Sequence, residues 1–468
     1  RFHSNWLSMI HSRLLAARYL LRPDGVIFVS IDDRELINLV KVMSEVFGEE
    51  NHVATFVRRR RLATGMGNNP ISPDHEYVVA YARQIETLNL RGFDRRASDF
   101  PFSDAKSKYR STDLTVGMTK EMRPNQYFAI KSTGNGTEYW PPEERVWRFE
   151  PTSMQLEIDA DNIIWPDNSA DSRMLRPRYK TRFATDDGET NPVSTWVQAK
   201  GGDRLPNDLS GWTAGLNTEA TQELRDILGD QLLEYPKPVS LIRDLAFVAT
   251  QPGEIILDFF GGSGTTAQAV MELNKADGGE REFILVQLPE LTAENSPAFK
   301  AGYKRISDIT IQRNKCVIER MRKETEDRLP GDAQRQFTDS LGFKVYTLAK
   351  SRFPRVEFAP DPEKNEVENV EALKRYIAEK EQSFHIQLDK EPVRDEVLLK
   401  QGFMFGYTLK PQPEFTKNEV VLVRDAHKES LLCLDAVIAP ETVDHFQTHK
   451  DRFFICLELA LDTTKKWN

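Results

Sequence analysis

Cysteine is scarce in this chain: three occur among 468 residues, and all of them lie in the last third. Cys316, Cys433 and Cys456 are far apart, and no Cys-x-x-Cys pair or paired Cys and His spacing occurs. The sequence therefore predicts neither a zinc site nor a disulfide framework, and we expect no metal. A reducing cytoplasm is the simplest compartment for such a chain.

Long hydrophobic runs are also missing, because no window approaches the roughly 18 consecutive apolar residues that a membrane helix needs. The first residues, Arg1-Phe-His-Ser-Asn-Trp6, lack the basic stretch and apolar run of a signal peptide. We therefore expect no membrane association. Because residue 1 is not methionine, we also expect the chain to begin inside a longer coding sequence.

Positive charge is in deficit overall, and the net charge of −9 argues against nucleic-acid binding over the whole surface. Residues 55–125 reverse this balance, with thirteen Lys and Arg against eight Asp and Glu. Such a basic segment suits an enzyme that contacts phosphates over one surface, although an unevenly charged, solvated loop fits the composition equally well. The candidate phosphate-binding residues are Arg58, Arg59, Arg60 and Arg61, with an exposed, charged edge strand as the alternative.

Two stretches have the periodicity of packed helices and strands, which predicts an α/β core. In residues 1–83 the expected elements are helix 6–21, a buried strand 26–31, a helix that opens with a capping-box spacing at 32–35 and ends at Gly48, and strands 52–57 and 75–82. In residues 231–323 they are a helix that follows Pro236-Lys237-Pro238 and runs to about Thr250, strand 254–259, helix 265–274, strand 282–288 and helix 302–323.

The remaining stretches differ in character. Residues 84–230 contain polar turns, proline pairs and scattered aromatics, which indicate an irregular insertion or a separate module. Trp140 and Trp147 could stack on bases there, yet a Trp in a small module is more often part of its core. After a polar linker at 324–340, residues 341–468 predict an α+β domain. Its expected elements are helix 367–380 and strands 342–348, 405–409, 419–423, 430–438 and 453–459.

The most informative local feature is the strand, loop and helix at 254–274. A buried strand ends at Asp258, glycines follow, and the amide N–H groups of the next helix point at a carboxylate or phosphate. A dinucleotide fits, because Gly262-x-Gly264-x-x-Ala267 satisfies the relaxed fingerprint, whereas no Lys precedes Thr265 as a triphosphate loop requires. S-adenosylmethionine fits as well, with its carboxylate at the helix start and its amino group facing Asp258. A tight turn that only packs a helix onto a sheet is the structural alternative.

The segment Asp258-Phe-Phe-Gly-Gly-Ser-Gly-Thr-Thr266 resembles the cofactor loop of amino-methylating DNA methyltransferases. Other segments resemble the Mod (modification) subunits of Type III restriction-modification systems over nearly the whole chain, and only the middle module is loosely matched. These segments are Asn5-Trp-Leu-Ser-Met-Ile-His-Ser-Arg-Leu-Leu15, Asp24-Gly-Val-Ile-Phe-Val-Ser-Ile-Asp-Asp33, Tyr235-Pro-Lys-Pro-Val-Ser-Leu-Ile-Arg-Asp244, Phe283-Ile-Leu-Val-Gln-Leu-Pro-Glu290, Gly302-Tyr-Lys-Arg-Ile-Ser-Asp-Ile309, and Gly342-Phe-Lys-Val-Tyr-Thr-Leu348 with Ser351-Arg-Phe353.

The resemblance implies a methyltransferase of the permuted (beta) class, in which the catalytic half of the sheet precedes target recognition and the cofactor half comes last. The expected fold is a Rossmann-like α/β methyltransferase core with an inserted target-recognition module and a C-terminal α+β domain. The implied domains are the catalytic half at 1–83, the target-recognition module at 84–230, the S-adenosylmethionine-binding half at 231–323, the linker at 324–340 and the C-terminal domain at 341–468.

The resemblance also implies the site residues. The cofactor-binding candidates are Lys237, Asp258, Phe260, Gly261, Ser263, Gly264, Thr265, Gln287 and Glu290. Gln287 stands where the wider class carries an acid for the ribose hydroxyls, and Glu290 lies one turn beyond it. Ser30 and Asp32 are candidates for the base pocket, with a helix N-cap explaining Asp32 equally well.

The family's catalytic loop, Asp-Pro-Pro-Tyr or a close variant, does not occur in the 468 residues. Trp140-Pro-Pro-Glu143 lacks the flanking residues and lies in the wrong module. We therefore expect the catalytic loop upstream of Arg1, no catalytic residue in this chain, and a second truncation at Asn468. In the intact enzyme that loop would hold the amine of a flipped adenine, whose nitrogen attacks the sulfonium methyl.

The favoured function is site-specific methylation of adenine N6 in double-stranded DNA. The resemblance implies a subunit that pairs with itself and with a restriction helicase-nuclease. Methylation of cytosine N4 stays open, because the discriminating residue lies in the absent loop. A dinucleotide-dependent oxidoreductase and a catalytically inactive DNA-binding fragment are alternatives from other classes.

Overall fold

The structure is a computed structural model, and it divides into two compact units, Arg1–Lys344 and Val345–Asn468, which are described separately. It describes residues 2–62, 71–95, 97–169, 173–183, 190–199, 212–326, 337–338, 340–348, 351, 358–386, 390–404, 406–447 and 453–461. Most of the predicted linker, at 327–336 and 339, lies outside these residues. None of the helices in the described ranges is long and apolar enough to cross a membrane.

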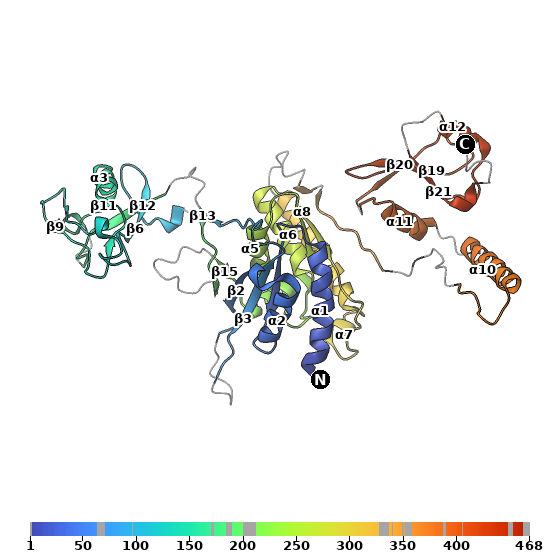
Figure 1. Ribbon diagram of the computed structural model, residues 1–468, viewed down its shortest axis with the longest axis horizontal. Coiled ribbons are helices and arrows are strands. Elements are labelled where there is room, and N and C mark those ends of the chain that lie inside the picture. The colour runs from blue at the N-terminus through green and yellow to red at the C-terminus, as the bar shows by residue number, and fades with distance from the viewer. Residues whose placement is uncertain are drawn as a thin grey trace. The chain divides into compact units, whose positions relative to one another are not determined.

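The first unit begins with two helices on one face of a sheet, α1 (Phe2–Leu20) and α2 (Leu36–Phe47), which lie side by side (Figure 1). They pack against β1 (Val26–Ile31) and β3 (His75–Ala82) in a core that includes Leu14, Leu39, Val79 and Tyr81. The predicted strands 26–31 and 75–82 are confirmed residue for residue.

This sheet has five strands in the order β1-β3-β2-β14-β15, where β2 is His52–Arg59, β14 is Trp196–Ala199 and β15 is Thr213–Ala214. Strand β3 is antiparallel to both neighbours, whereas β14 is parallel to β2. Successive side chains of a strand point to opposite faces. Val78 and Ala80 therefore face away from α1 and α2 and pack with Trp212 and α5 (Val239–Ala249).

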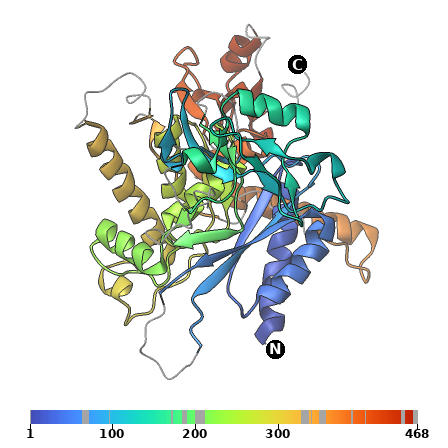
Figure 2. The same ribbon diagram turned by 90° about the vertical axis from the view of Figure 1, so that its left-hand side faces the viewer.

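Strands β14 and β15 correct the expected extent of the middle module. Both fall within residues 84–230, yet they extend the core sheet at the edge of β2. Helix α4 (Asn217–Leu228), also in that range, packs against α8 (Ile306–Glu326), as the green and gold helices of Figure 2 show. The core thus resumes before residue 230, because these short elements complete its sheet and helix layer.

A second, parallel pair of strands carries the glycine-rich segment. Strand β16 (Ile255–Asp258) pairs with β17 (Glu282–Leu285), and α6 (Thr265–Asp277) connects them. Helix α6 packs against α5, and its Ala267 and Met271 share a core with Val317 and Met321 of α8. The short helix α7 (Pro297–Lys300) precedes α8.

The two strand groups lie next to each other in the first unit. Arg22, just before β1, forms a 2.6 Å ion pair with Glu254, just before β16. At the other end, Phe259 packs into the core of α1, α2 and β1. The carboxyl ends of β1 and β16 therefore lie at the same edge.

The middle module is built from short antiparallel strands. Its largest sheet has the order β11-β12-β6-β5, formed by Ile163–Ile164, Arg178–Arg182, Lys108–Asp113 and Phe102–Ser103. The two-stranded ribbons are β4 (Phe93–Asp94) with β13 (Thr190–Asn191), β7 (Thr115–Val116) with β10 (Val146–Trp147), and β8 (Ile130–Lys131) with β9 (Glu138–Tyr139). Helix α3 (Pro151–Asp159) contributes Met154 to a core around Trp147, whereas Trp140 is exposed.

The second unit combines helices α10 (Glu366–Ile386), α11 (Lys390–Lys400) and α12 (Pro440–Gln447) with one sheet, as an α+β arrangement requires. The sheet order is β18 (Thr408–Pro411), β19 (Val420–Arg424), β20 (Glu429–Cys433) and β21 (Phe454–Cys456). The last pair is parallel and the others are antiparallel.

Two local predictions are wrong. Residues 342–348 form no strand: no strand among the described residues pairs with them, and Val345 and Leu348 stay exposed. The capping box at 32–35 does not form either: α2 starts after Glu35, whose side chain makes no cap hydrogen bond. Asp32 instead accepts a hydrogen bond from the Arg34 amide, so it is not the N-cap residue.

Candidate functional site

The loop of residues 258–266, called the glycine loop below, joins β16 to α6. Asp258 fixes both of its ends: one carboxylate oxygen accepts the Phe260 amide at 3.0 Å, and the other accepts the Thr266 hydroxyl at 2.6 Å. The acid predicted from the sequence thus stands at the carboxyl end of the strand. Ligands bind at this edge of open α/β sheets.

Glycine is required at two turns of this loop, because Gly262 and Gly264 have φ angles of 51° and 81°. A Cβ atom on Gly264 would lie 2.9 Å from Asn314 Nδ2 and 3.1 Å from Thr310 Cγ2, both on α8. The Thr310 hydroxyl donates to the Gly262 carbonyl at 2.5 Å. Packing against α8 therefore explains Gly264, whereas Gly262 has open space where a Cβ would point, apart from the Phe260 carbonyl.

The start of α6 offers free donors to a ligand. Gly264 is the N-cap residue and has no side chain with which to accept from the first turn. The first amide N–H groups of a helix lack intrahelical partners and favour an anion. The hydroxyls of Ser263 and Thr265 are buried and bond to Arg313 of α8 instead. The backbone amides, not these hydroxyls, are thus the groups placed for ligand binding.

The two ribose candidates differ in their surroundings. Gln287 Oε1 accepts the Gly262 amide at 2.8 Å, so this side chain already supports the glycine loop. Glu290 is exposed, and its backbone carbonyl accepts the Ile306 amide. Of the two ribose candidates, Glu290 is therefore the one that carries an acidic, exposed side chain.

Lys237 is held by a buried carboxylate. Its Nζ donates to both oxygens of Glu76, at 2.9 and 3.1 Å, and Arg58 bonds the same carboxylate at 2.7 Å. Burial alone would raise the pKa of Glu76, but the charges of Arg58 and Lys237 outweigh it and lower that pKa. The Lys237 carbonyl also accepts the Thr265 hydroxyl at 3.4 Å. The Lys237 backbone therefore lies beside the glycine loop, while its Nζ is bonded to Glu76.

Arg58 does not match the expected phosphate-binding role. Its side chain is fully buried and bonds Glu76, the Gly215 carbonyl and Asn217. A cation enclosed in this way presents no surface to a DNA backbone. Arg59 and Arg61 are exposed, and Arg60 donates to the Pro73 carbonyl, so the expectation applies to these three.

Ser30 lies near the carboxyl end of β1 and Asp32 directly follows this strand, so both are at the edge of the sheet where the glycine loop lies. Both are partly buried. Phe259 of the loop packs in the same core as Ile31, which separates them. The structure thus brings the base-pocket candidates to the same edge as the cofactor candidates.

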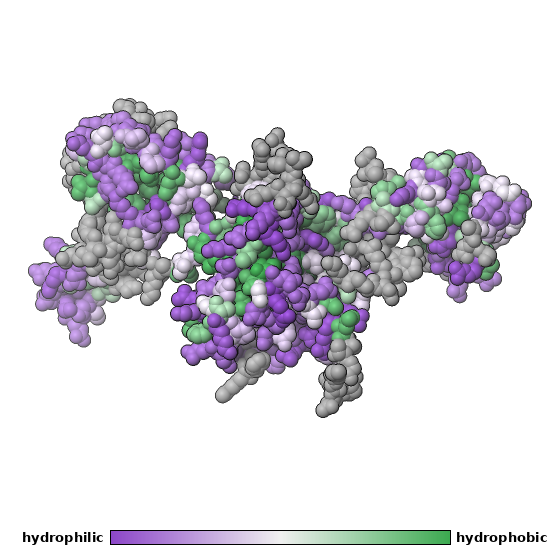
Figure 3. Space-filling model, turned by 180° about the vertical axis from the view of Figure 1, so that it is seen from behind, coloured by the Kyte–Doolittle hydropathy of each residue, from purple (hydrophilic) through white to green (hydrophobic). Residues whose placement is uncertain are grey.

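Apolar side chains are exposed around β16 and β17. Figure 3 shows green, hydrophobic residues gathered among purple, hydrophilic ones on one face of the protein. Phe260 is 52% exposed and directly follows the strand that carries Asp258. The others are Ile255, Ile284, Val286 and Leu288. An exposed ring beside a ligand-binding edge suits a flat aromatic group such as adenine.

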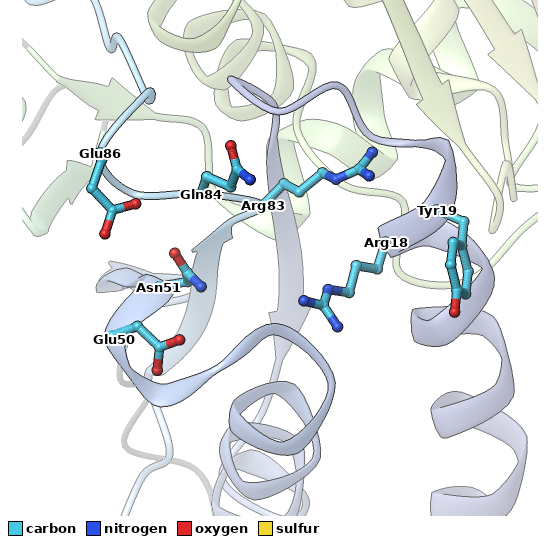
Figure 4. A pocket seen from close by; sticks show the side chains of 7 residues that line it. All are labelled: Arg18, Tyr19, Glu50, Asn51, Arg83, Gln84 and Glu86. Carbon is cyan, nitrogen blue, oxygen red and sulfur yellow. The ribbon is translucent and has the colours of Figure 1, made fainter.

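A polar cavity of about 470 Å³ lies elsewhere (Figure 4). Its lining comes from the end of α1 and from the segments before β2 and after β3: Arg18, Tyr19, Glu50, Asn51, Arg83, Gln84 and Glu86. Because the Arg83 amide bonds the Gly25 carbonyl, this cavity is at the amino end of β1. It is on the edge of the sheet opposite to the glycine loop.

The sequence profile of the DNA methylase family matches residues 1–290, which is more than half of the chain. The chain belongs to the DNA methylase family.

Named relatives of this DNA methylase include Mod subunits of Type III restriction-modification enzymes. The StyLTI Mod subunit of Salmonella typhimurium is 32% identical over 354 residues, covering 74% of this chain and 49% of the relative. The EcoPI Mod subunit of Escherichia phage P1 is 32% identical over 343 residues, covering 68% and 50%. The Type II methyltransferase M.KpnI of Klebsiella pneumoniae is 30% identical over 325 residues, covering 66% and 73%. The chain thus spans about half the length of the Mod subunits that it matches.

Three residues around the site of this DNA methylase belong to none of the sequence motifs and were not predicted: Glu76, Asn217 and Arg313. Glu76 lies near the start of β3, and the residues that follow it in this strand are largely apolar. Its partner Lys237 is far away in sequence. Arg313 has a detectable signal, because it falls between Ile309 and Val317 on the buried stripe of α8 at helical spacing. A charged residue on such a stripe indicates a buried polar contact.

Proposed function

We propose that this chain is the cofactor-binding and target-recognising part of a site-specific DNA methyltransferase that methylates adenine at N6. The whole enzyme would be the modification subunit of a Type III restriction-modification system. Membership of the DNA methylase family and the similarity to Mod subunits support this proposal.

The observation that carries the cofactor assignment is the glycine loop. Its N-cap glycine leaves the first amides of α6 open to a carboxylate, and Asp258 stands at the adjoining strand end. Lys237 supplies a cation beside the same loop. This donor set fits S-adenosylmethionine, which carries a carboxylate and a cationic amine on one short chain. Phe260 and Glu290 would hold the adenine and ribose.

Bound S-adenosylmethionine would supply a methyl group on a sulfonium, which is already a good leaving group. The residues of this chain bind and orient it: the start of α6 and Lys237 hold the carboxylate, and Asp258 holds the amine. The 468 residues contain no Asp-Pro-Pro-Tyr segment to hold the target amine. Positioning is therefore the contribution that this chain makes to transfer.

We also propose that β17-β16 and β1-β3-β2 are two halves of one Rossmann-like sheet, with the middle module as an insertion. The Arg22–Glu254 pair and the packing of Phe259 against α1 and α2 support this layout. The middle module would read the DNA, and Arg59 to Arg61 would contact its backbone. A homodimer and a restriction subunit are the expected protein partners.

Titration calorimetry with S-adenosylhomocysteine tests the cofactor assignment, with NAD as the comparison ligand. We expect saturable binding of S-adenosylhomocysteine and none of NAD. Binding of NAD alone would replace the methyltransferase proposal by the dinucleotide alternative. A separate titration of double-stranded DNA with the chain then measures DNA binding.

A further inference from the structure

Arg313 of α8 is a buried arginine behind the glycine loop. Its side chain is 1% exposed, among the largest fully buried side chains of the described residues. Burial lowers its pKa to about 10, which leaves the guanidinium charged at neutral pH. A buried charge is costly unless its surroundings compensate it.

The hydrogen bonds of Arg313 hold both sides of the turn at Gly264. Nη1 donates to Ser263 Oγ and to Thr265 Oγ1, each at 2.8 Å. Nε and Nη2 donate to Gln268 Oε1 at 3.1 and 2.9 Å, one turn further along α6. Because a guanidinium only donates, the two hydroxyls must accept, and their hydrogens turn away from Arg313. The Arg313 side chain thus holds the junction between the glycine loop and α6 in place.

All of these acceptors are neutral. Among the described residues, no carboxylate lies within ion-pair distance of Arg313, although its guanidinium uses all three nitrogens. The hydrogen bonds of Glu223 and Glu272 end on Gln268, whose amide nitrogen donates to both, at 2.7 and 2.8 Å. The charges of these two acids raise the pKa of Arg313 but do not outweigh its burial. Carboxylates therefore compensate the positive charge at the start of α6 only from beyond the neutral Gln268.

We infer that Arg313 is a positioning residue of the glycine loop whose buried charge strengthens the hold of the loop on the carboxylate of an S-adenosylmethionine-type ligand. This inference rests on the proposed function. The helix start already favours an anion, and a fixed cation behind it adds to the same field. Its Nη1 bonds the hydroxyls of Ser263 and Thr265, which flank the N-cap residue Gly264, so the charge lies next to this helix start.

Two ligands separate the charge effect from a merely structural one. S-adenosylhomocysteine has the amino-acid carboxylate and ammonium group, whereas 5′-methylthioadenosine has the same nucleoside and a thioether but neither of these charged groups. For Arg313→Gln we expect S-adenosylhomocysteine to bind about tenfold more weakly, which corresponds to about 1.4 kcal/mol. The affinity for 5′-methylthioadenosine should stay unchanged. Arg313→Lys, which keeps the charge, should recover most of the loss.

Arg320 provides the matched control on the same helix. It is half-exposed and contacts Glu272 and Glu324 at 3.8 and 3.9 Å, but not the glycine loop. Arg320→Gln should therefore leave the affinity for both ligands as in wild type. Thermal unfolding of each variant verifies that it is folded.

Glu223→Gln tests the inference without altering Arg313, in case Arg313→Gln does not fold. At pH 8, removal of this acid should tighten S-adenosylhomocysteine binding and leave 5′-methylthioadenosine binding unchanged. Equal weakening of both ligands in Arg313→Gln, or no change in either variant, would overturn the inference and spare the proposed function. Failure of the wild-type chain to bind S-adenosylhomocysteine would overturn both.

Discussion

Asp258 combines a structural and an electrostatic role in one carboxylate. Asp258→Asn keeps one oxygen, which can accept the Phe260 amide, but it removes the negative charge and the second oxygen, which accepts the Thr266 hydroxyl. We expect a loss of S-adenosylhomocysteine affinity of about tenfold or more, because the ligand amine loses its charge-assisted partner. Titration calorimetry measures it. Glu254→Gln, at the opposite end of the same strand, is the control and should bind normally.

Glu76 pairs with two cations, the buried Arg58 and the partly exposed Lys237. Glu76→Ala leaves Arg58 buried without its carboxylate, which should cost about 3–5 kcal/mol of unfolding free energy. Urea unfolding with wild type as reference measures this loss. An exposed acid such as Glu144 gives the control, since Glu144→Ala should change stability little.

The contribution of the Glu76 carboxylate to the free energy of unfolding should decrease as the pH falls. Its folded-state pKa is below the ordinary value of 4.5, so the unfolded chain takes up the proton first. The stabilisation is complete above that ordinary value and is lost as pH falls through the folded-state pKa. We therefore expect the stability gap between wild type and Glu76→Gln to shrink in acid. A gap that stays constant from neutral to acidic pH would contradict the ion-pair assignment.

At the scale of single residues, the strand-loop-helix pattern located Asp258 and the glycines between β16 and α6, and the family resemblance singled out Lys237. The cofactor-binding roles of these residues stay predictions. Arg58 was misplaced, because neighbouring arginines of a strand alternate between interior and surface, and the sequence does not say which side Glu76 occupies. Arg313 was missed because its acceptors lie about 45 to 50 positions away.

At the scale of elements, strong periodicity predicted well and short polar segments did not. Strand 26–31 is a nearly continuous apolar run and strand 75–82 is apolar after Glu76, and their bounds are those of β1 and β3. Residues 342–348 alternate between apolar and polar side chains, but they pair with no strand of the described residues. A strand needs a neighbour for its backbone hydrogen bonds, and the neighbour is not encoded in the segment itself.

The junction between the glycine loop and α6 allows an element-scale prediction. Gly264→Ala meets both a positive φ angle and close contacts with α8, so it should lower both stability and S-adenosylhomocysteine affinity. Gly278, at the other end of α6, has a φ angle of 69° but nothing within 4 Å of an added Cβ. Gly278→Ala should cost only the backbone strain of about 1 kcal/mol. Thermal unfolding and calorimetry compare them, and equal effects would refute the role of α8.

At the scale of the whole molecule, the site is held by pairs that join distant parts of the first unit. Glu76 bonds Lys237 across 161 positions, and Arg58 bonds Asn217 across 159. These contacts bring the first strands to the helices that surround the glycine loop. The order of the segments could be predicted from sequence, but such pairings could not, because they depend on how strands and helices are arranged in space.

The ribbon β4–β13 permits a deletion that tests the role of the middle module. Asp94 and Thr190 are register partners, so an Asn-Gly turn could replace residues 95–189 and leave the core sheet intact. We expect this chain to fold and to bind S-adenosylhomocysteine as wild type does, while its affinity for double-stranded DNA falls. Fluorescence anisotropy at several salt concentrations measures the loss of DNA affinity. The change in the salt dependence of this affinity reports how many phosphate contacts the module makes.

Deletion of 84–230 is the contrasting variant: it also removes β14, β15 and the Asn217 partner of Arg58, so it should unfold the core. Undiminished DNA binding by the shorter deletion would place target recognition outside the middle module.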